Sequence, residues 1–181
     1  MKRAALLTAL VLNTVTLVLL PTIAGCGRLP DFHPELSDLP DEGTTVPMRI
    51  AANRPFVEVS LNGKGPYTFL LDTGCSYVFV SQRIADELGL KEWQTHRVRY
   101  QTNSGEYKGQ TTWARLESLK LGELELKQFD VGVKVADSIL VKSRCDGILG
   151  IKVLEQWLLT LDFPAKQVTI AQGQLPTPDN Q

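Results

Sequence analysis

The middle of the chain is dominated by apolar and polar positions that alternate with a period of two. Residues 56–61 alternate in this way and end at Asn62-Gly63, a dipeptide typical of a tight hairpin. An apolar run at residues 67–71 predicts the returning strand. Further strands are predicted at residues 77–80, 97–102, 108–121, 123–126, 129–134, 158–163 and 168–171.

Helical patterns are few and short. Ser81 is a suitable N-cap for a helix that ends near Gly89, and residues 153–157 show a second helical pattern. Many short strands separated by Gly or Asn turns favour a mainly β fold, a closed β-barrel with one or two short helices. Residues 48–171, about 125 residues, are enough for one domain and leave no room for a second.

The two ends of the chain differ from this pattern. Met1-Lys2-Arg3 is basic and precedes an apolar run at residues 4–20, which is the pattern of a secretory signal peptide. The run is long enough to span a bilayer, so a permanent transmembrane anchor is the alternative. Residues 172–181, with Pro176 and Pro178, predict a disordered tail.

Residues 26–47 are expected to form a flexible tether between the leader and the domain. Most of this segment combines prolines with acidic residues and shows little apolar periodicity. A coil of about twenty residues has an end-to-end distance of about 25 Å, which is enough to lift a domain clear of lipid headgroups.

Composition and charge narrow the function classes. The hydrophobic fraction of 43% and the charged fraction of 22% are ordinary for a globular protein. Removal of residues 1–25 lowers the count of Lys and Arg from 19 to 17 against 20 acidic residues, a net charge of about −3. No basic cluster stands out, so we expect no binding to nucleic acid.

Asp72-Thr73-Gly74 is the first motif with candidate chemistry. Buried strand residues deliver the Asp72 carboxylate to a Thr-Gly turn. Desolvation there raises a carboxyl pKa, whereas backbone amides of the turn stabilise the ionised form. A general acid or base needs this balance. The alternative interpretation is an ordinary turn that ends a strand.

A second segment, Asp146-Gly147-Ile148-Leu149-Gly150, lies 75 positions after the motif and precedes a helical pattern. In order and spacing, the two segments together resemble those of the retropepsin-like aspartic peptidases, over about residues 48–171. The resemblance implies the fold of half a pepsin and an aspartic endopeptidase that needs no cofactor. It assigns Asp72, Thr73 and Gly74 to the catalytic motif, and it places Ile148 and Leu149 beneath that motif at the substrate groove.

A single Asp-Thr-Gly motif implies a homodimer, because this chemistry needs two carboxylates facing one water. Two Asp72 side chains on a twofold axis would share one proton. One would activate water while the other polarises the peptide carbonyl. In the resemblance, Thr73 braces the dimer across the axis and Gly74 allows the tight turn, while Ser76 could bond the carboxylate or cap the turn.

A flap that covers the substrate is predicted at residues 100–107. Asn103, Ser104 and Gly105 form a turn between β-rich arms, and Tyr100 and Tyr107 are candidates to line the groove. Any exposed hairpin would show the same pattern, which is the alternative.

The tetrapeptide Ile23-Ala24-Gly25-Cys26 resembles the bacterial lipobox. It implies that residues 1–25 are cleaved and that Cys26 carries acyl chains, which would anchor the protein to a membrane. By resemblance to lipoprotein sorting, Gly27 favours the outer membrane of a bacterial cell envelope, and we expect the protein to face the periplasm.

The remaining cysteines, Cys75 and Cys145, form an even pair in a compartment that permits disulfides. Two interpretations stay open, a disulfide between them or two small buried thiols that only pack, because the sequence does not give the Cα separation that a disulfide requires.

Other enzyme classes have little support. The only histidines are His33, in the predicted tether, and His96, so a serine or cysteine hydrolase has no evident base. No metal-ligand spacing is present, and we expect neither a metal nor a cofactor. The alternative functions are a non-catalytic envelope lipoprotein that binds extended peptides in the groove by strand addition, and a structural lipoprotein.

Overall fold

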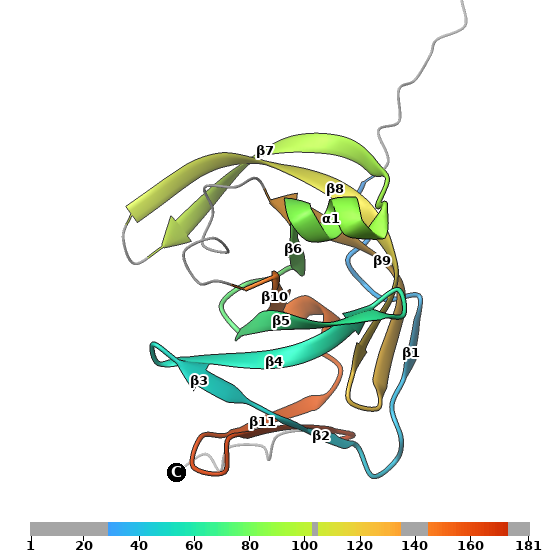
Figure 1. Ribbon diagram of the computed structural model, residues 1–181, viewed down its shortest axis with the longest axis vertical. Coiled ribbons are helices and arrows are strands. Elements are labelled where there is room, and N and C mark those ends of the chain that lie inside the picture. The colour runs from blue at the N-terminus through green and yellow to red at the C-terminus, as the bar shows by residue number, and fades with distance from the viewer. Residues whose placement is uncertain (1–28, 103–104, 135–144, 174–181) are drawn as a thin grey trace, which may run out of the picture.

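The structure is a computed structural model that describes residues 29–102, 105–134 and 145–173 (Figure 1). Nearly all regular structure in these ranges is β, so the predicted mainly β fold is confirmed. The elements are β1 (Leu36–Asp38), β2 (Thr44–Pro47), β3 (Arg49–Ala51), β4 (Arg54–Leu61), β5 (Lys64–Asp72), β6 (Phe79–Ser81), α1 (Gln82–Leu88), β7 (Glu92–Thr102), β8 (Gly105–Leu121), β9 (Leu124–Lys134), β10 (Gly147–Gly150), the 3-10 turn η1 (Ile151–Val153), β11 (Leu158–Asp162) and β12 (Gln167–Ala171).

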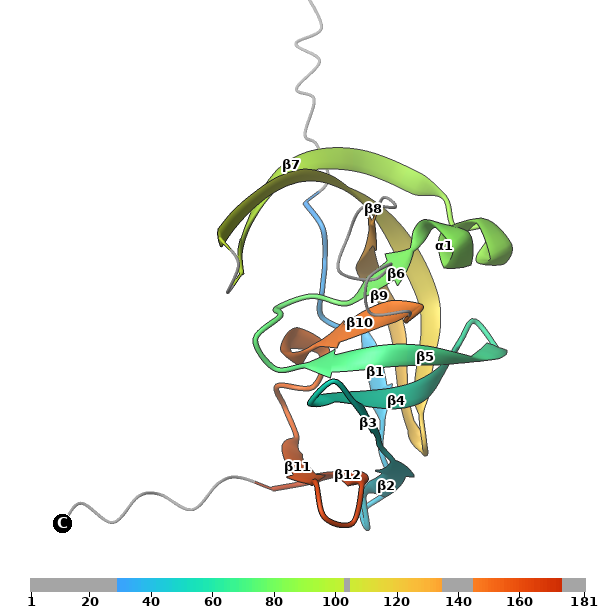
Figure 2. The same ribbon diagram turned by 60° about the vertical axis from the view of Figure 1, so that its left-hand side comes forward.

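Strand pairing runs in a closed circuit. β4 pairs with β5, β5 with β10, β10 with β6, β6 with β9, β9 with β8, and β8 again with β4. The β5–β10 and β6–β9 pairs are parallel and the others are antiparallel. β7 extends the sheet as a hairpin with β8, while β11, β12 and β2 form a separate small sheet (Figure 2).

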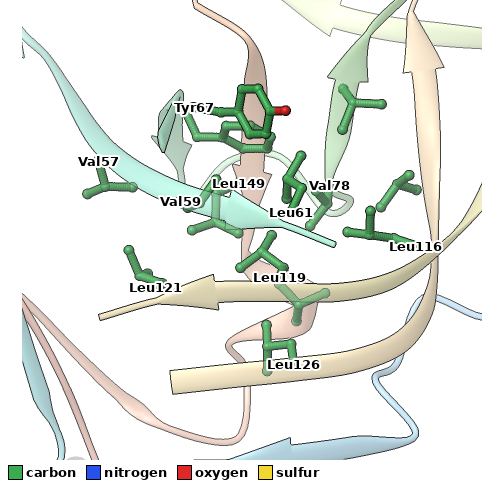
Figure 3. Packing of buried hydrophobic residues seen from close by; sticks show 14 of the residues in the cluster. Val57, Val59, Leu61, Tyr67, Val78, Leu116, Leu119, Leu121, Leu126 and Leu149 are labelled. Carbon is green, nitrogen blue, oxygen red and sulfur yellow. The ribbon is translucent and has the colours of Figure 1, made fainter. Parts of the chain in front are cut away.

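The circuit encloses the main core. Alternate residues of its strands point inward, because successive side chains of a strand face opposite sides. Burial of each leucine side chain stabilises the folded state by about 1.5–3 kcal/mol relative to leaving it exposed to water. Figure 3 shows this packing between β4, β8, β9 and β10. The fully buried leucines of the core include Leu61, Leu116, Leu119, Leu121, Leu124, Leu126 and Leu149.

The predicted helix after Ser81 is confirmed. The Ser81 hydroxyl accepts a hydrogen bond from the Ile84 N–H at 3.3 Å, and Gly89 ends the helix in the left-handed conformation with φ 64°. The second predicted helix, residues 153–157, is wrong. The chain forms η1 instead, since the N–H groups of Ile151 and Lys152 bond to the loop after β5.

Two predicted strands, residues 123–126 and 129–134, are one strand in the structure. β9 runs continuously through Gln128, whose φ of 58° is unusual for a side chain other than glycine. The pairing with β8 skips this position. The local irregularity shifts the alternation of side chains, which explains why the pattern resembles two strands.

The predicted tether is corrected for residues 29–47. β1 pairs with β9, and β2 pairs with β12 in the small sheet. The physical reason is that the outer edge of β9 offers backbone groups that residues 31–38 satisfy; the Glu35 N–H, for example, donates to the Lys127 carbonyl at 3.0 Å. The domain therefore begins well before residue 48.

In the parts of the chain that the structure describes, no helix is long and apolar enough to cross a membrane. The predicted signal peptide and Cys26 lie outside these parts, as does most of the predicted tail.

We expect Leu126→Ala to lower the free energy of unfolding by about 2–5 kcal/mol, because it leaves a cavity in a fully buried site. Urea denaturation measures this change. Leu29→Ala is the matched control, since Leu29 is 81% exposed, and it should change stability by less than about 0.5 kcal/mol. Equal effects of the two variants would contradict the description of the core.

Candidate active site

β5 carries Asp72 to the edge of the core. Phe69 and Leu71 point into the main core, and Asp72 is the last, partly exposed residue of the strand. Its Oδ1 accepts a hydrogen bond from the Gly74 N–H at 3.0 Å, and its carbonyl accepts one from the Cys75 N–H at 3.0 Å. The tight turn therefore holds the carboxylate in a fixed orientation, while Thr73 and Gly74 are exposed.

The loop after Asp72 is fixed to the chain that follows β10. The Ile151 N–H donates to the Cys75 carbonyl at 2.8 Å, and the Lys152 N–H donates to the Ser76 carbonyl at 3.0 Å. Gly150 pairs directly with Asp72. A Cβ at Gly150 would lie 2.3 Å from the Tyr77 carbonyl oxygen and 2.7 Å from that of Cys75, so only glycine fits.

Ile148 and Leu149, both predicted at the groove, point to opposite sides of β10. Ile148 faces the same side as Leu70, its partner on β5. Leu149 is fully buried in the main core, so its predicted place at the groove is corrected. The reason is the alternation of side chains along a strand, which allows only one of two neighbours to face the groove.

A second apolar cluster lies on the side of the sheet that faces away from the main core. On β5 the residues of this side are Thr68, Leu70 and Asp72, so the cluster adjoins the Asp72 carboxylate. We call it the groove cluster. Its buried members are Phe56, Leu70, Phe79, Trp113, Cys145 and Ile148. Through Phe56 it also borders an open cleft of about 410 Å³.

The predicted flap corresponds to the hairpin of β7 and β8. Tyr100 pairs with Tyr107 and Thr102 with Gly105, so the two strands are in register up to the turn. The hairpin arches above β5 and β10 (Figures 1 and 2). Asn103 and Ser104 lie outside the described residues.

A polar network that sequence reasoning missed fixes the start of β10 to β5 and α1. Asp146 accepts a hydrogen bond from the Thr68 N–H at 2.9 Å and from Arg83. Arg83 also pairs with Glu87 at 2.9 Å, and Glu87 accepts a hydrogen bond from the Tyr67 hydroxyl at 2.7 Å. Burial, with the bond to Glu87, raises the pKa of Tyr67 above its ordinary 10.0. One sign of this network was present in the sequence, the acidic Asp146 directly before Gly147.

Of the two interpretations of the cysteines, the disulfide is wrong. Between these two described cysteines, Cys75 and Cys145, no disulfide is formed. The two cysteines lie at opposite ends of β10. Cys145 lies two residues before the strand begins, whereas the Cys75 carbonyl accepts a hydrogen bond from Ile151, the residue that follows the strand. A strand of four residues spans about 10 Å, which exceeds the Cα separation of about 7 Å that a disulfide allows.

Both thiols contact the groove cluster, Cys145 as a buried member and Cys75 as a partly buried neighbour. The Cys75 thiol donates to the Tyr77 carbonyl at 3.4 Å. Burial raises the pKa of the Cys145 thiol, which packs in the groove cluster. Cys145 therefore matches the alternative interpretation, a small buried thiol.

Within the described ranges, no group of three or more His, Cys, Asp or Glu residues is arranged to hold a metal ion.

More than half of the chain matches a known protein family. Residues 57–153 match the model of the family described as Aspartyl protease. They include both the Asp72 turn and β10. A comparison with curated proteins found no match.

Solved structures add a likeness of fold. A retropepsin-like aspartic protease from Rickettsia conorii has 21% sequence identity and a TM-score of 0.50, covering 75% of this chain and 92% of that one. The retroviral protease-like domain of Ddi1 from Leishmania major has 14% identity and a TM-score of 0.38, covering 68% and 95%. The first likeness shows that the fold is retropepsin-like.

We expect Gly150→Ala to lower the free energy of unfolding by about 1–3 kcal/mol, because its Cβ would collide with backbone oxygens that cannot easily move. Chemical denaturation measures the loss. Gly74→Ala is the matched control: its Cβ would meet only Asp72 Oδ1, at 3.3 Å, and stability should stay within about 1 kcal/mol. A harmless Gly150→Ala would show that the loop is not packed as described.

Proposed function

Because this chain belongs to the aspartyl protease family, we propose that it is an aspartic endopeptidase that hydrolyses peptide bonds. The observation that carries the proposal is the Asp72 turn. A carboxylate at the end of a buried strand accepts the Gly74 N–H at 3.0 Å and adjoins an apolar surface on the same side of the sheet. The carboxylate would act on the peptide while that surface receives neighbouring side chains.

The catalytic unit in this proposal is a homodimer. The chain has one Asp-Thr-Gly motif, and Thr73 and Gly74 are exposed beside the carboxylate, where a second copy has access. Two Asp72 side chains across a twofold axis cannot both ionise, since like charges repel at short range, and so they share a proton. The apparent pKa values then belong to the pair.

The chemistry follows from this shared proton. The ionised carboxylate takes a proton from a bound water, which attacks the carbonyl carbon of the peptide. The protonated partner donates a hydrogen bond to the carbonyl oxygen, where negative charge develops. The β7–β8 hairpin, above β5 and β10, would exclude bulk water from the substrate.

We also propose that acyl chains on Cys26 anchor the enzyme to a membrane of a bacterial envelope, with the domain facing the periplasm. The support is the sequence Ile23-Ala24-Gly25-Cys26 after a basic start and an apolar run. Several acyl chains on one residue give stable anchoring, whereas a single chain gives marginal binding.

Asp72→Asn should lower kcat/KM for peptide cleavage by roughly 10²- to 10⁴-fold, because the amide can neither activate water nor share a proton. Cleavage of a peptide library, followed by mass spectrometry from acid to neutral pH, measures it. The rate for the native sequence should also rise with the square of protein concentration below the dimer Kd.

Asp41→Asn is the control for this test, since Asp41 is exposed in the turn before β2. Cleavage that persists in Asp72→Asn would exclude the proposed mechanism. Folded protein that binds extended peptides but cleaves none at any pH would favour the peptide-binding alternative.

Cys26→Ala should abolish incorporation of labelled palmitate and shift the protein from the membrane fraction to the soluble fraction or to an uncleaved precursor. Fractionation of a bacterial host, with autoradiography, measures both. Cys75→Ala is the matched control and should keep the label. Label that remains in Cys26→Ala would overturn the proposed anchor.

A further inference from the structure

The groove cluster receives an aromatic side chain from a distant part of the sequence. Residues 29–35, which precede β1 and which we call the N-terminal arm, run beside β9 below the arch of β7 and β8 (Figure 2). Phe32 of this arm packs against the groove cluster. The ring therefore lies on the side of the sheet that carries Asp72.

The contacts of Phe32 are with aromatic rings. Its centroid lies 4.0 Å from that of Tyr77 and 4.8 Å from that of Trp113, the latter with an edge-on interplanar angle of 66°. Tyr77 and Trp113 also contact each other, with centroids 5.9 Å apart. The two contacts with Trp113 lie within the separation of about 4.5–7 Å at which aromatic pairs are favourable. Tyr77 belongs to the loop that follows Asp72, and so the ring of Phe32 occupies space beside the catalytic turn.

The backbone of the arm is fixed next to Phe32. The Asp31 N–H donates to Asp130 Oδ2 at 2.8 Å, and the Asp130 N–H donates to the Asp31 carbonyl at 2.7 Å. On the other side of Phe32, His33 Nε2 lies 3.2 Å from Glu155 Oε1, and Glu35 pairs with Arg115. Because bonds lie on both sides, the ring is held as part of the groove wall.

We propose that Phe32 is a specificity-determining residue, which fills an aromatic subsite beside Asp72 from within the chain. Substrates that present a small side chain to this subsite leave the ring in place. A substrate with an aromatic side chain there must displace Phe32 from Tyr77 and Trp113, so such peptides are poor substrates. The inference rests on the proposed function and names its substrate class: extended peptides with a small residue at this position.

The test is the variant Phe32→Ala, compared with the native sequence on a peptide library analysed by mass spectrometry. We expect kcat/KM to rise at least about tenfold for peptides with an aromatic residue at one fixed position near the cut, and to change less than about threefold for those with alanine there. Phe163→Ala is the matched control, since Phe163 is 50% exposed in the turn between β11 and β12. Unchanged cleavage profiles would overturn the proposal.

A second variant and a second readout separate this inference from the proposed function. Phe32→Val keeps part of the apolar volume and should give an intermediate gain, even if Phe32→Ala unfolds. In an Asp72→Asn background, N-acetyl-phenylalaninamide should bind at least about tenfold more tightly once Phe32 is Ala or Val, whereas N-acetyl-alaninamide should not. If the native sequence cleaves nothing but this gain appears, the proposed function fails and the subsite stands. If peptides are cleaved but neither Phe32 variant improves the cleavage or binding of aromatic ligands, the subsite is excluded and the proposed function stands.

Discussion

The insertion of β10 between β5 and β6 is the constraint on which the rest of the structure depends. Its four residues pair in parallel with the strand that carries Asp72, and the first two of them, Gly147 and Ile148, also pair antiparallel with β6. Gly147 and Gly150 permit this approach, since a Cβ on either would overlap the Phe69 ring or backbone oxygens. A slip of one residue would exchange Ile148 and Leu149 between the two apolar clusters. The register therefore determines both the core and the surface beside the carboxylate.

A buried carboxylate on β9 holds the N-terminal arm in place. The Asp130 side chain is fully buried in β9, where an isolated charge would be costly. The Asp31 N–H at 2.8 Å and Arg115 at 3.6 Å offset that cost. Asp31 lies 99 positions before Asp130 in the sequence. The N-terminal arm is therefore bound to the fold by the need to satisfy this group.

Sequence reasoning could predict what depends on local chemistry. Alternation predicted the main strands, Ser81 and Gly89 predicted α1, and the Asp72 turn with Gly147 to Gly150 indicated the retropepsin-like fold. It failed where the structure of a segment depends on contacts with residues far away in the sequence. Residues 29–47 look like a tether because their partners lie on β9 and β12, and Cys75 and Cys145 look like a pair because pairing geometry is not visible in their spacing. The sequence signal that residues 29–47 belong to the domain was Phe32, an aromatic residue within an acidic, Pro-rich stretch.

With the proposed acylation of Cys26, the early attachment of the arm would determine how closely the domain is held to the bilayer. Asp31, bonded to β9, lies only five positions after Cys26. The segment from Cys26 to Asp31 would span at most about 18 Å even when fully extended, so the domain could not move far from the acyl chains. The domain would then rest at the headgroup surface with its lateral motion restricted to the membrane plane. Two copies confined in this way meet at a raised effective concentration. The substrates within reach would be the parts of envelope proteins that lie closest to the lipid.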